Sequence, residues 1–232
     1  MQGELEAAIG RLTGDAPERL RLRAAGRTDA GVHATGQVVT FSTWRDWPAA
    51  QWVRAVNAVL PADISVLRAQ AVAPDFDPRR HATSRSYRYQ VLVQGAPCPM
   101  RRRTHHQVDA LWHEGPMAEA WENLVGTHDF ASFCSTGSSE RGTIVTVTAA
   151  NVTRQDDERL LSITAISFLY HMVRRLVGAA LAVGRGVLSP ADFRRFLEEP
   201  GGSHPPAPTA PAHGLILTNV TYPAPWSWAT SG

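Results

Sequence analysis

The 232-residue sequence contains no lysine. Its 23 basic residues are therefore all arginines, set against 21 acidic residues, and the formal net charge is only +2. A charge this small does not by itself indicate a polyanionic partner. The planar guanidinium of arginine, however, matches phosphates and stacks on bases, so the surface is chemically suited to nucleic acid.

Cysteine and long apolar runs are also scarce. Cys98 and Cys134 are the only cysteines, and because nothing indicates an oxidising compartment we expect both to be reduced. No apolar run approaches the roughly 20 residues that a membrane span needs. The first residues are polar and acidic, unlike a secretory signal, and we therefore expect a cytoplasmic location.

The histidines lack the spacing of a metal site. His105 and His106 are adjacent, and neighbouring residues on a strand point to opposite faces, so we expect no metal. An apolar content of 44% and a charged content of 19% are typical of a folded globular chain with one large domain or two small ones.

Hydrophobic periodicity predicts helices mixed with strands. Helices are expected over residues 3–12, 48–61, 117–125, 168–183 and 189–198, and strands over 19–25, 37–42, 64–72, 84–93, 143–152, 159–167 and 215–222. The basic stretch 95–107, a linker loop, divides an N-terminal half, 1–94, from a C-terminal half, 108–223, and a tail follows at 224–232. Each half combines helices and strands, which predicts the α+β class.

The densest group of polar residues lies between two predicted strands, from Gly26 to His33. Loops held by a rigid sheet often present catalytic residues, and Asp29 is the candidate here. The alternative is a simple turn, in which Asp29 bonds the backbone and Gly31 supplies a positive φ.

Tyr87 and Arg174 stand out from their surroundings. Tyr87 shares one face of an alternating strand with Tyr89 and Val91, where it is either a half-buried sheet aromatic or a stacking platform for a base. Arg174 lies near the start of an otherwise apolar helix, and it is either an ordinary exposed arginine or part of a site. The arginine triplet at 101–103 is either ordinary solvated surface or a binding site for phosphates.

Several motifs follow one another along nearly the whole chain. They are Arg27-Thr28-Asp29-Ala30-Gly31-Val32-His33-Ala34, Asn57-Ala58-Val59-Leu60-Pro61-Ala62-Asp63-Ile64, Phe76-Asp77-Pro78-Arg79, Ser84-Arg85-Ser86-Tyr87-Arg88-Tyr89, Gly126-Thr127-His128-Asp129-Phe130-Ala131-Ser132-Phe133, Phe168-Leu169-Tyr170-His171-Met172-Val173-Arg174, and Ala210-Pro211-Ala212-His213-Gly214-Leu215 with Tyr222-Pro223. In this order they resemble the tRNA pseudouridine synthase A family.

The resemblance implies a pseudouridine synthase fold: two ferredoxin-like halves, a joined antiparallel sheet and a central RNA-binding cleft. It also implies a homodimer without metal or organic cofactor. It further implies an isomerase that converts uridine to pseudouridine at positions thirty-eight to forty, in the anticodon stem-loop of tRNA. The alternatives are a pseudouridine synthase for other RNA and a non-catalytic RNA-binding protein.

The resemblance also assigns roles to single residues. Asp29 matches the catalytic aspartate, and Arg174 matches the arginine that pairs with it. Arg27 matches the arginine linked to base flipping, and Tyr87 matches the tyrosine that stacks on the target base. Further RNA contacts are expected from a last group of residues: Phe76, Arg79, Arg80 and Arg141.

The sequence departs from the family at its beginning. Family members place a strand with a Tyr-Asp-Gly motif before the first helix, whereas Met1 here directly precedes that helix. In a ferredoxin-like half this strand is central, so we expect that the native chain starts further upstream. A measured native mass near 25.3 kDa would contradict this expectation.

Overall fold

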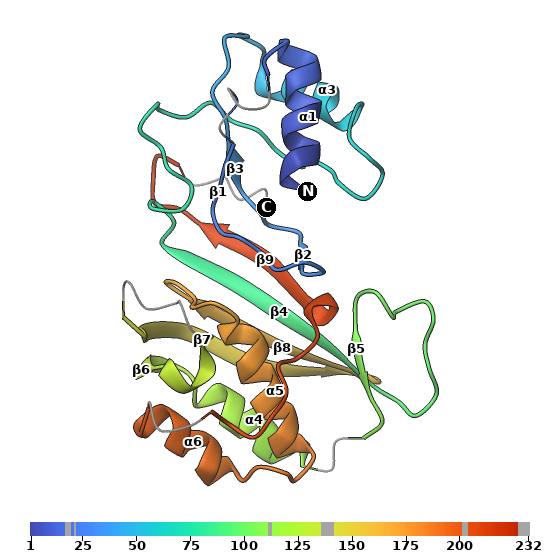
Figure 1. Ribbon diagram of the computed structural model, residues 1–232, viewed down its shortest axis with the longest axis vertical. Coiled ribbons are helices and arrows are strands. Elements are labelled where there is room, and N and C mark those ends of the chain that lie inside the picture. The colour runs from blue at the N-terminus through green and yellow to red at the C-terminus, as the bar shows by residue number, and fades with distance from the viewer. Residues whose placement is uncertain (17–19, 21, 111–112, 136–141, 201–203, 227–232) are drawn as a thin grey trace. The chain divides into compact units, whose positions relative to one another are not determined.

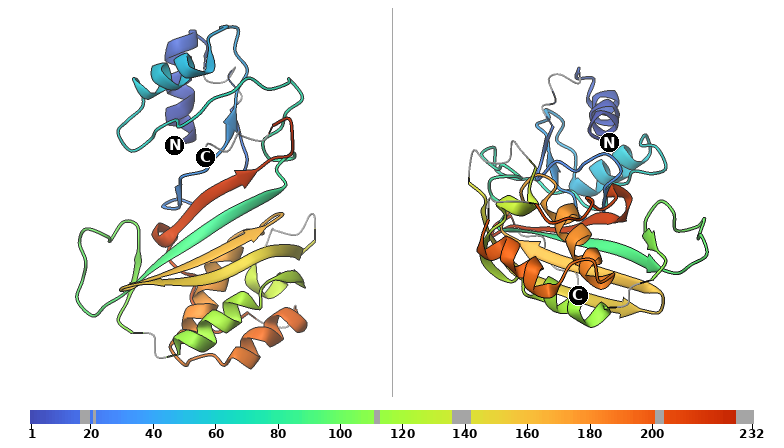
Figure 2. Two further views of the ribbon diagram at one scale, coloured as in Figure 1. Left: turned by 180° about the vertical axis from the view of Figure 1, so that it is seen from behind. Right: turned by 60° about the horizontal axis from the view of Figure 1, so that its bottom comes forward.

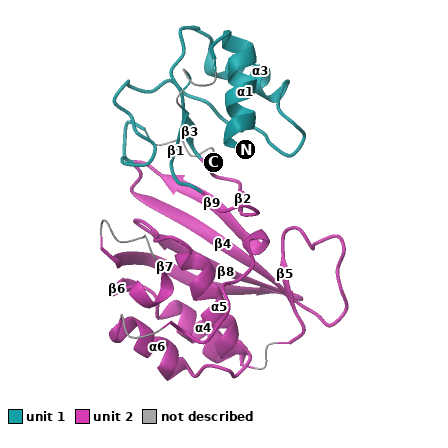
Figure 3. Ribbon diagram, in the orientation of Figure 1, with its two compact units in different colours: residues 1–27, 38–81, 223–232 teal, residues 28–37, 82–222 magenta. Residues whose placement is uncertain are grey.

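The computed structural model describes residues 1–16, 20, 22–110, 113–135, 142–200 and 204–226. These residues form two compact units (Figure 3). Unit 1 comprises residues 1–27, 38–81 and 223–232, and unit 2 comprises residues 28–37 and 82–222. Within the described part of the chain, no helix is both long enough and apolar enough to cross a bilayer.

Unit 1 contains two helices and a short strand pair. Helix α1 spans Gln2–Thr13, helix α3 spans Ala49–Asn57, and β1 (Arg23–Ala24) pairs antiparallel with β3 (Val39–Thr40). The apolar faces of both helices share one buried cluster: Leu5, Ala8, Ile9, Leu20, Leu22, Trp52 and Val56. Both predicted helices are thus present, but the predicted strands at 19–25 and 37–42 shrink to two residues each within the described chain.

The predicted strand at 64–72 is wrong, because the structure has no strand there. The side chain of Asn57 satisfies the backbone of Val66 instead: Nδ2 donates to the Val66 carbonyl at 2.8 Å and Oδ1 accepts from the Val66 N–H at 2.7 Å. Ile64 and Val66 pack on the cluster of unit 1, so their alternation reflects packing rather than a strand ladder.

Unit 2 is built on a seven-stranded sheet (Figure 1). The strands run in the order β2 (His33–Ala34), β9 (Leu215–Thr221), β4 (Ser84–Val93), β8 (Glu158–Ala165), β7 (Ile144–Gln155) and β6 (Gly126–Asp129). A short strand, β5 (His106–Val108), pairs with the end of β4 that β9 does not reach. Only the β2–β9 and β4–β5 pairs are parallel.

This sheet unites strands from both sides of residues 95–107. Strand β4 precedes that stretch, and its neighbours β8 and β9 follow it. The predicted α+β class with a joined sheet is therefore confirmed. The division into halves at 95–107 stays a prediction.

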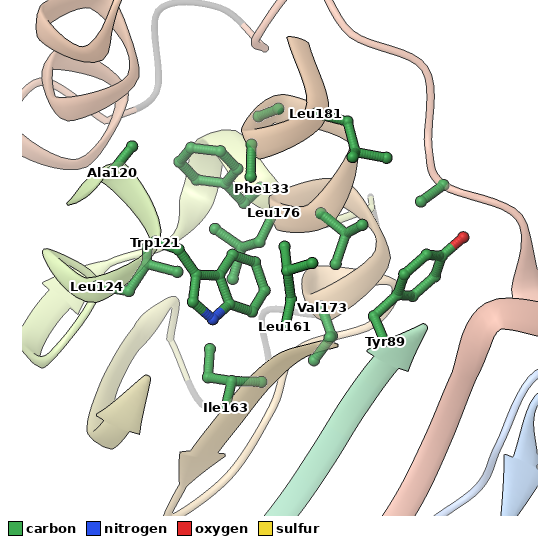
Figure 4. Close-up of a cluster of buried hydrophobic side chains, with 14 of the residues drawn as sticks. Tyr89, Ala120, Trp121, Leu124, Phe133, Leu161, Ile163, Val173, Leu176 and Leu181 are labelled. Atoms are coloured by element: carbon green, nitrogen blue, oxygen red, sulfur yellow. The ribbon is translucent and has the colours of Figure 1, made fainter. Parts of the chain in front are cut away.

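Helices α4 (Glu114–Glu122), α5 (Met172–Gly184) and α6 (Pro190–Glu198) cover one face of the sheet, as two further views show (Figure 2). Helix α5 is buried along its whole length except at Arg174 and Arg175. Between α5 and the sheet lies the main core, in which Trp121, Phe133, Leu161 and Ile163 interlock with the helix (Figure 4). The indole N–H of Trp121 donates to the Ser162 carbonyl at 2.9 Å, so even this buried polar group is paired.

Candidate active site

Asp29 lies in a tight turn that leads into β2. The Val32 N–H donates to the Asp29 carbonyl at 3.0 Å, and Gly31 supplies a φ of +85°. After the turn, β2 pairs with β9, and Gly36 packs so closely that a Cβ there would lie 2.3 Å from the Thr218 carbonyl oxygen. The turn interpretation and the site interpretation are thus compatible, because a well-anchored turn presents the carboxylate.

Arg174 reaches that carboxylate from the first turn of α5. Its Nη1 donates to Asp29 Oδ2 at 2.7 Å, and its Nε donates to the Ala210 carbonyl at 2.8 Å. The Ala210 N–H returns a hydrogen bond to the Arg174 carbonyl at 3.1 Å. This explains an arginine on a buried helix: its charge is compensated by a carboxylate, and its Nε donor is paired with a backbone carbonyl.

His171 also lies beside Asp29, and the sequence analysis did not select it. Its Nε2 is 3.3 Å from Asp29 Oδ2, and its Nδ1 is 2.9 Å from the Ser135 hydroxyl. The predicted helix 168–183 in fact starts at Met172, and His171 precedes it with a φ of +62°. The missed signal is the spacing of His171 and Arg174, which would share a face of any helix that contained both.

Tyr87 lies on β4, half-buried, with its ring edge against Phe168 at 5.1 Å between ring centroids. Burial raises the pKa of its hydroxyl; Arg85 opposes this rise and the Asp29 carboxylate adds to it. The hydroxyl is therefore neutral at physiological pH.

The segment from Ala210 to Gly214 links Arg174 to Tyr89 on β4. The Tyr89 hydroxyl donates to the Pro211 carbonyl at 2.8 Å, and Gly214 lies so close that a Cβ would be 2.7 Å from the Tyr89 ring. Ala210 binds Arg174 through both its N–H and its carbonyl, so the C-terminal motif positions the Asp29–Arg174 pair.

The basic stretch 95–107 is tied to the Asp29 turn as well. His33 Nε2 is 2.7 Å from the Arg103 carbonyl oxygen. Arg101 forms ion pairs with Glu158 at 2.8 Å and Asp157 at 3.2 Å, so the first arginine of the triplet has a structural role. The other two arginines of the triplet are exposed.

The remaining predicted residues belong to unit 1 or lie outside the described chain. Arg27, Arg79 and Arg80 are exposed, and Asp77 accepts from the N–H groups of the latter two at 2.9 and 3.0 Å, which makes 76–80 a closed turn. Phe76 is buried against the rings of His81 and Trp226. Arg141 lies outside the described residues. The expected RNA contacts of this group stay predictions.

The polar side chains against the Asp29 carboxylate are those of Arg174 and His171. Nowhere in the described chain do three or more metal-ligating side chains gather as a metal site would require. Cys98 and Cys134 are both free thiols. A carboxylate held by a guanidinium can act as a nucleophile or as a base.

Comparisons with known proteins identify the family. The sequence pattern of a family described as tRNA pseudouridine synthase matches residues 1–79 and 120–223. Curated proteins named tRNA pseudouridine synthase A are similar over 96% of this chain: one from Moorella thermoacetica is 42% identical and covered over 89% of its length, one from Neisseria gonorrhoeae is 41% identical and covered over 83%, and one from Bacillus subtilis is 37% identical and covered over 89%. The motifs, the α+β fold and these similarities agree, and the chain belongs to the tRNA pseudouridine synthase family.

Proposed function

We propose that this protein isomerises uridine to pseudouridine in tRNA, at positions thirty-eight to forty of the anticodon stem-loop. The observation that carries the proposal is the Asp29–Arg174 pair, joined at 2.7 Å and built from two distant family motifs. The family membership of the chain supports the reaction, and the family resemblance of these motifs supports the positions.

The reaction needs few groups. The bond from N1 of uracil to C1′ of ribose breaks, the uracil turns, C5 bonds to C1′, the proton on C5 is released, and N1 takes up a proton. No electrons enter or leave, so no redox partner is required. Asp29 supplies the carboxylate that acts on the target nucleotide. Arg174 compensates its charge in a half-buried position and holds its orientation.

The surrounding residues prepare the nucleotide. A uridine inside a stem-loop is stacked, and an enzyme must extrude it before reacting with it. We assign this step to Arg27, and we assign stacking on the extruded base to Tyr87. The exposed arginines at 79 and 80, with Arg141, are assigned to the phosphates of the stem.

Release of tritium from C5 tests the assignment. With tRNA that carries [5-³H]uridine, the wild-type protein should release label into water, and Asp29→Asn should not. This substitution keeps the shape of the side chain and removes its charge. Release by Asp29→Asn at the wild-type rate would refute the role of Asp29. If neither protein released label while both bound tRNA, the protein would be a non-catalytic RNA-binding protein.

Replacement of the target uridines by cytidine tests the positions. Loss of release when positions thirty-eight to forty are replaced supports the proposal, whereas retained release indicates other positions or another RNA. We also propose a cytoplasmic homodimer. Light scattering during size-exclusion chromatography measures the mass of the assembly, and a monomer mass at working concentration would contradict the dimer.

A further inference from the structure

We propose that His171 is a positioning residue for Asp29 and that Asp29 reacts through its Oδ1 atom. The inference rests on the proposed function and assigns separate tasks to the two carboxylate oxygens. One oxygen is held by the protein, and the other is left for the nucleotide.

The contacts of Asp29 are one-sided. Arg174 Nη1 at 2.7 Å and His171 Nε2 at 3.3 Å both lie against Oδ2. Among the residues that the structure describes, no hydrogen bond or ion pair reaches Oδ1. Two contacts from different directions fix the rotation of the carboxylate about its last bond. Oδ1 keeps its lone pairs unengaged, which is what a nucleophile or a base requires.

His171 is itself held from its other nitrogen. The Ser135 hydroxyl lies 2.9 Å from Nδ1, and the Ser135 N–H donates to the Tyr170 carbonyl at 3.1 Å. The Tyr170 ring stacks on the imidazole with 3.7 Å between ring centroids. The Ser135 contact at Nδ1 and the stacked Tyr170 ring therefore orient the imidazole with Nε2 toward Asp29. The 3.3 Å separation is slightly long for a hydrogen bond, as is common before substrate binds.

The backbone at His171 favours a functional role over a structural one. A φ of +62° is uncommon for a residue with a Cβ, and such conformations cluster at functional sites. His171 is the N-cap residue of α5, yet its side chain makes no capping hydrogen bond to the helix. The ring therefore does not serve the helix, and its polar contacts are with Asp29 and Ser135.

Four substitutions at this position separate the explanations. His171→Ala removes the ring and keeps the backbone strain, whereas His171→Gly removes both. The amide of His171→Gln can reach Asp29, as Nε2 does, and the shorter amide of His171→Asn can reach only Ser135. Asn also tolerates a positive φ, so it is the matched control for the backbone.

The readouts are single-turnover pseudouridine formation with enzyme in excess, the Kd for the stem-loop RNA, and the Tm. We expect Ala, Gly and Asn to slow the reaction about ten- to hundredfold, because a displaced reacting group has this order of effect. Gln should recover most of the rate. The Kd should stay within about twofold for all four, since Oδ1 acts after binding.

Several results would overturn the proposal. If Gly recovered the rate that Ala lost, relief of strain would be the cause. If Asn matched the wild type, the contact with Asp29 would be irrelevant, and if the Tm and the rate fell together in all four variants, the role would be structural. Ser135→Ala gives an independent check: it should slow the wild type but add nothing to His171→Ala. If the wild type were inactive, the proposed function would fail first, and the inference about His171 would fail with it.

Discussion

Removal of the Arg174 guanidinium tests whether the pair with Asp29 supports stability as well as catalysis. The substitution Arg174→Met keeps most of the aliphatic length and removes the charge. It deletes the 2.7 Å bond to Asp29 and the 2.8 Å bond to Ala210. The side chains of Asp29 and Arg174 are only 25% and 17% exposed, so water replaces these contacts incompletely.

The expected cost follows from this partial burial. Breaking a fully buried ion pair by removing one partner costs about 3–5 kcal/mol, and an exposed pair contributes about 0–1 kcal/mol. At this intermediate exposure we expect Arg174→Met to lower the free energy of unfolding by about 2 kcal/mol. Much of that loss is the unpaired carboxylate, so the double variant with Asp29→Asn should recover about 1 kcal/mol.

Urea unfolding of the four proteins of this cycle measures the coupling, with tritium release as the second readout. Stability should partly return in the double variant, but activity should not, because the carboxylate to which we assign catalysis is gone. A coupling energy below about 0.5 kcal/mol, with Arg174→Met as stable as the wild type, would refute the reasoning from burial.

Three further predictions concern the scaffold. Trp121→Ala should lower the free energy of unfolding by about 3–5 kcal/mol in a urea titration, because the indole fills the centre of the core and its N–H is paired; a loss under 1 kcal/mol would contradict that placement. Gly178→Ala should reduce both stability and activity despite the better helix propensity of alanine, since its Cβ would lie 2.1 Å from the Pro208 carbonyl oxygen; a rise in Tm would disprove this close approach. Burial lowers the pKa of His106 to about 4. As the pH falls, His106 is therefore protonated near pH 6.5 in the unfolded chain but only near pH 4 in the folded chain. Stability should therefore be complete above about pH 6.5 and fall as the pH drops toward 4, and His106→Gln should flatten this fall in urea titrations.

The sequence allowed much of the scaffold to be predicted and part of the site. The apolar stripe of α5 and the alternation of β4 were strong patterns, and both elements are present. The strand at 64–72 failed because an asparagine side chain replaced a ladder, which no periodicity reveals. His171 was missed because the sequence pattern extends the predicted helix back to residue 168. Nothing in that pattern marks His171 as a residue of positive φ just before the helix.

The roles of site residues depended on resemblance more than on pattern. Asp29 could be a plain turn residue and Arg174 a surface charge until the fold joined them across 145 positions of sequence. Successive tertiary contacts also escape prediction from local propensity. For example, the Tyr89 hydroxyl bonds Pro211, and the neighbouring Ala210 bonds Arg174.

The pairing of β2 with β9 has a consequence for synthesis of the protein on the ribosome. The strand that follows Asp29 emerges well before its partner at residues 216–217. Ala210, which orients Arg174, emerges equally late. A nascent chain therefore carries Asp29 without the contacts that hold it, and the proposed catalytic centre assembles only after Ala210 and β9 have been made. Contacts so distant in sequence also predict slow folding, governed by this final closure.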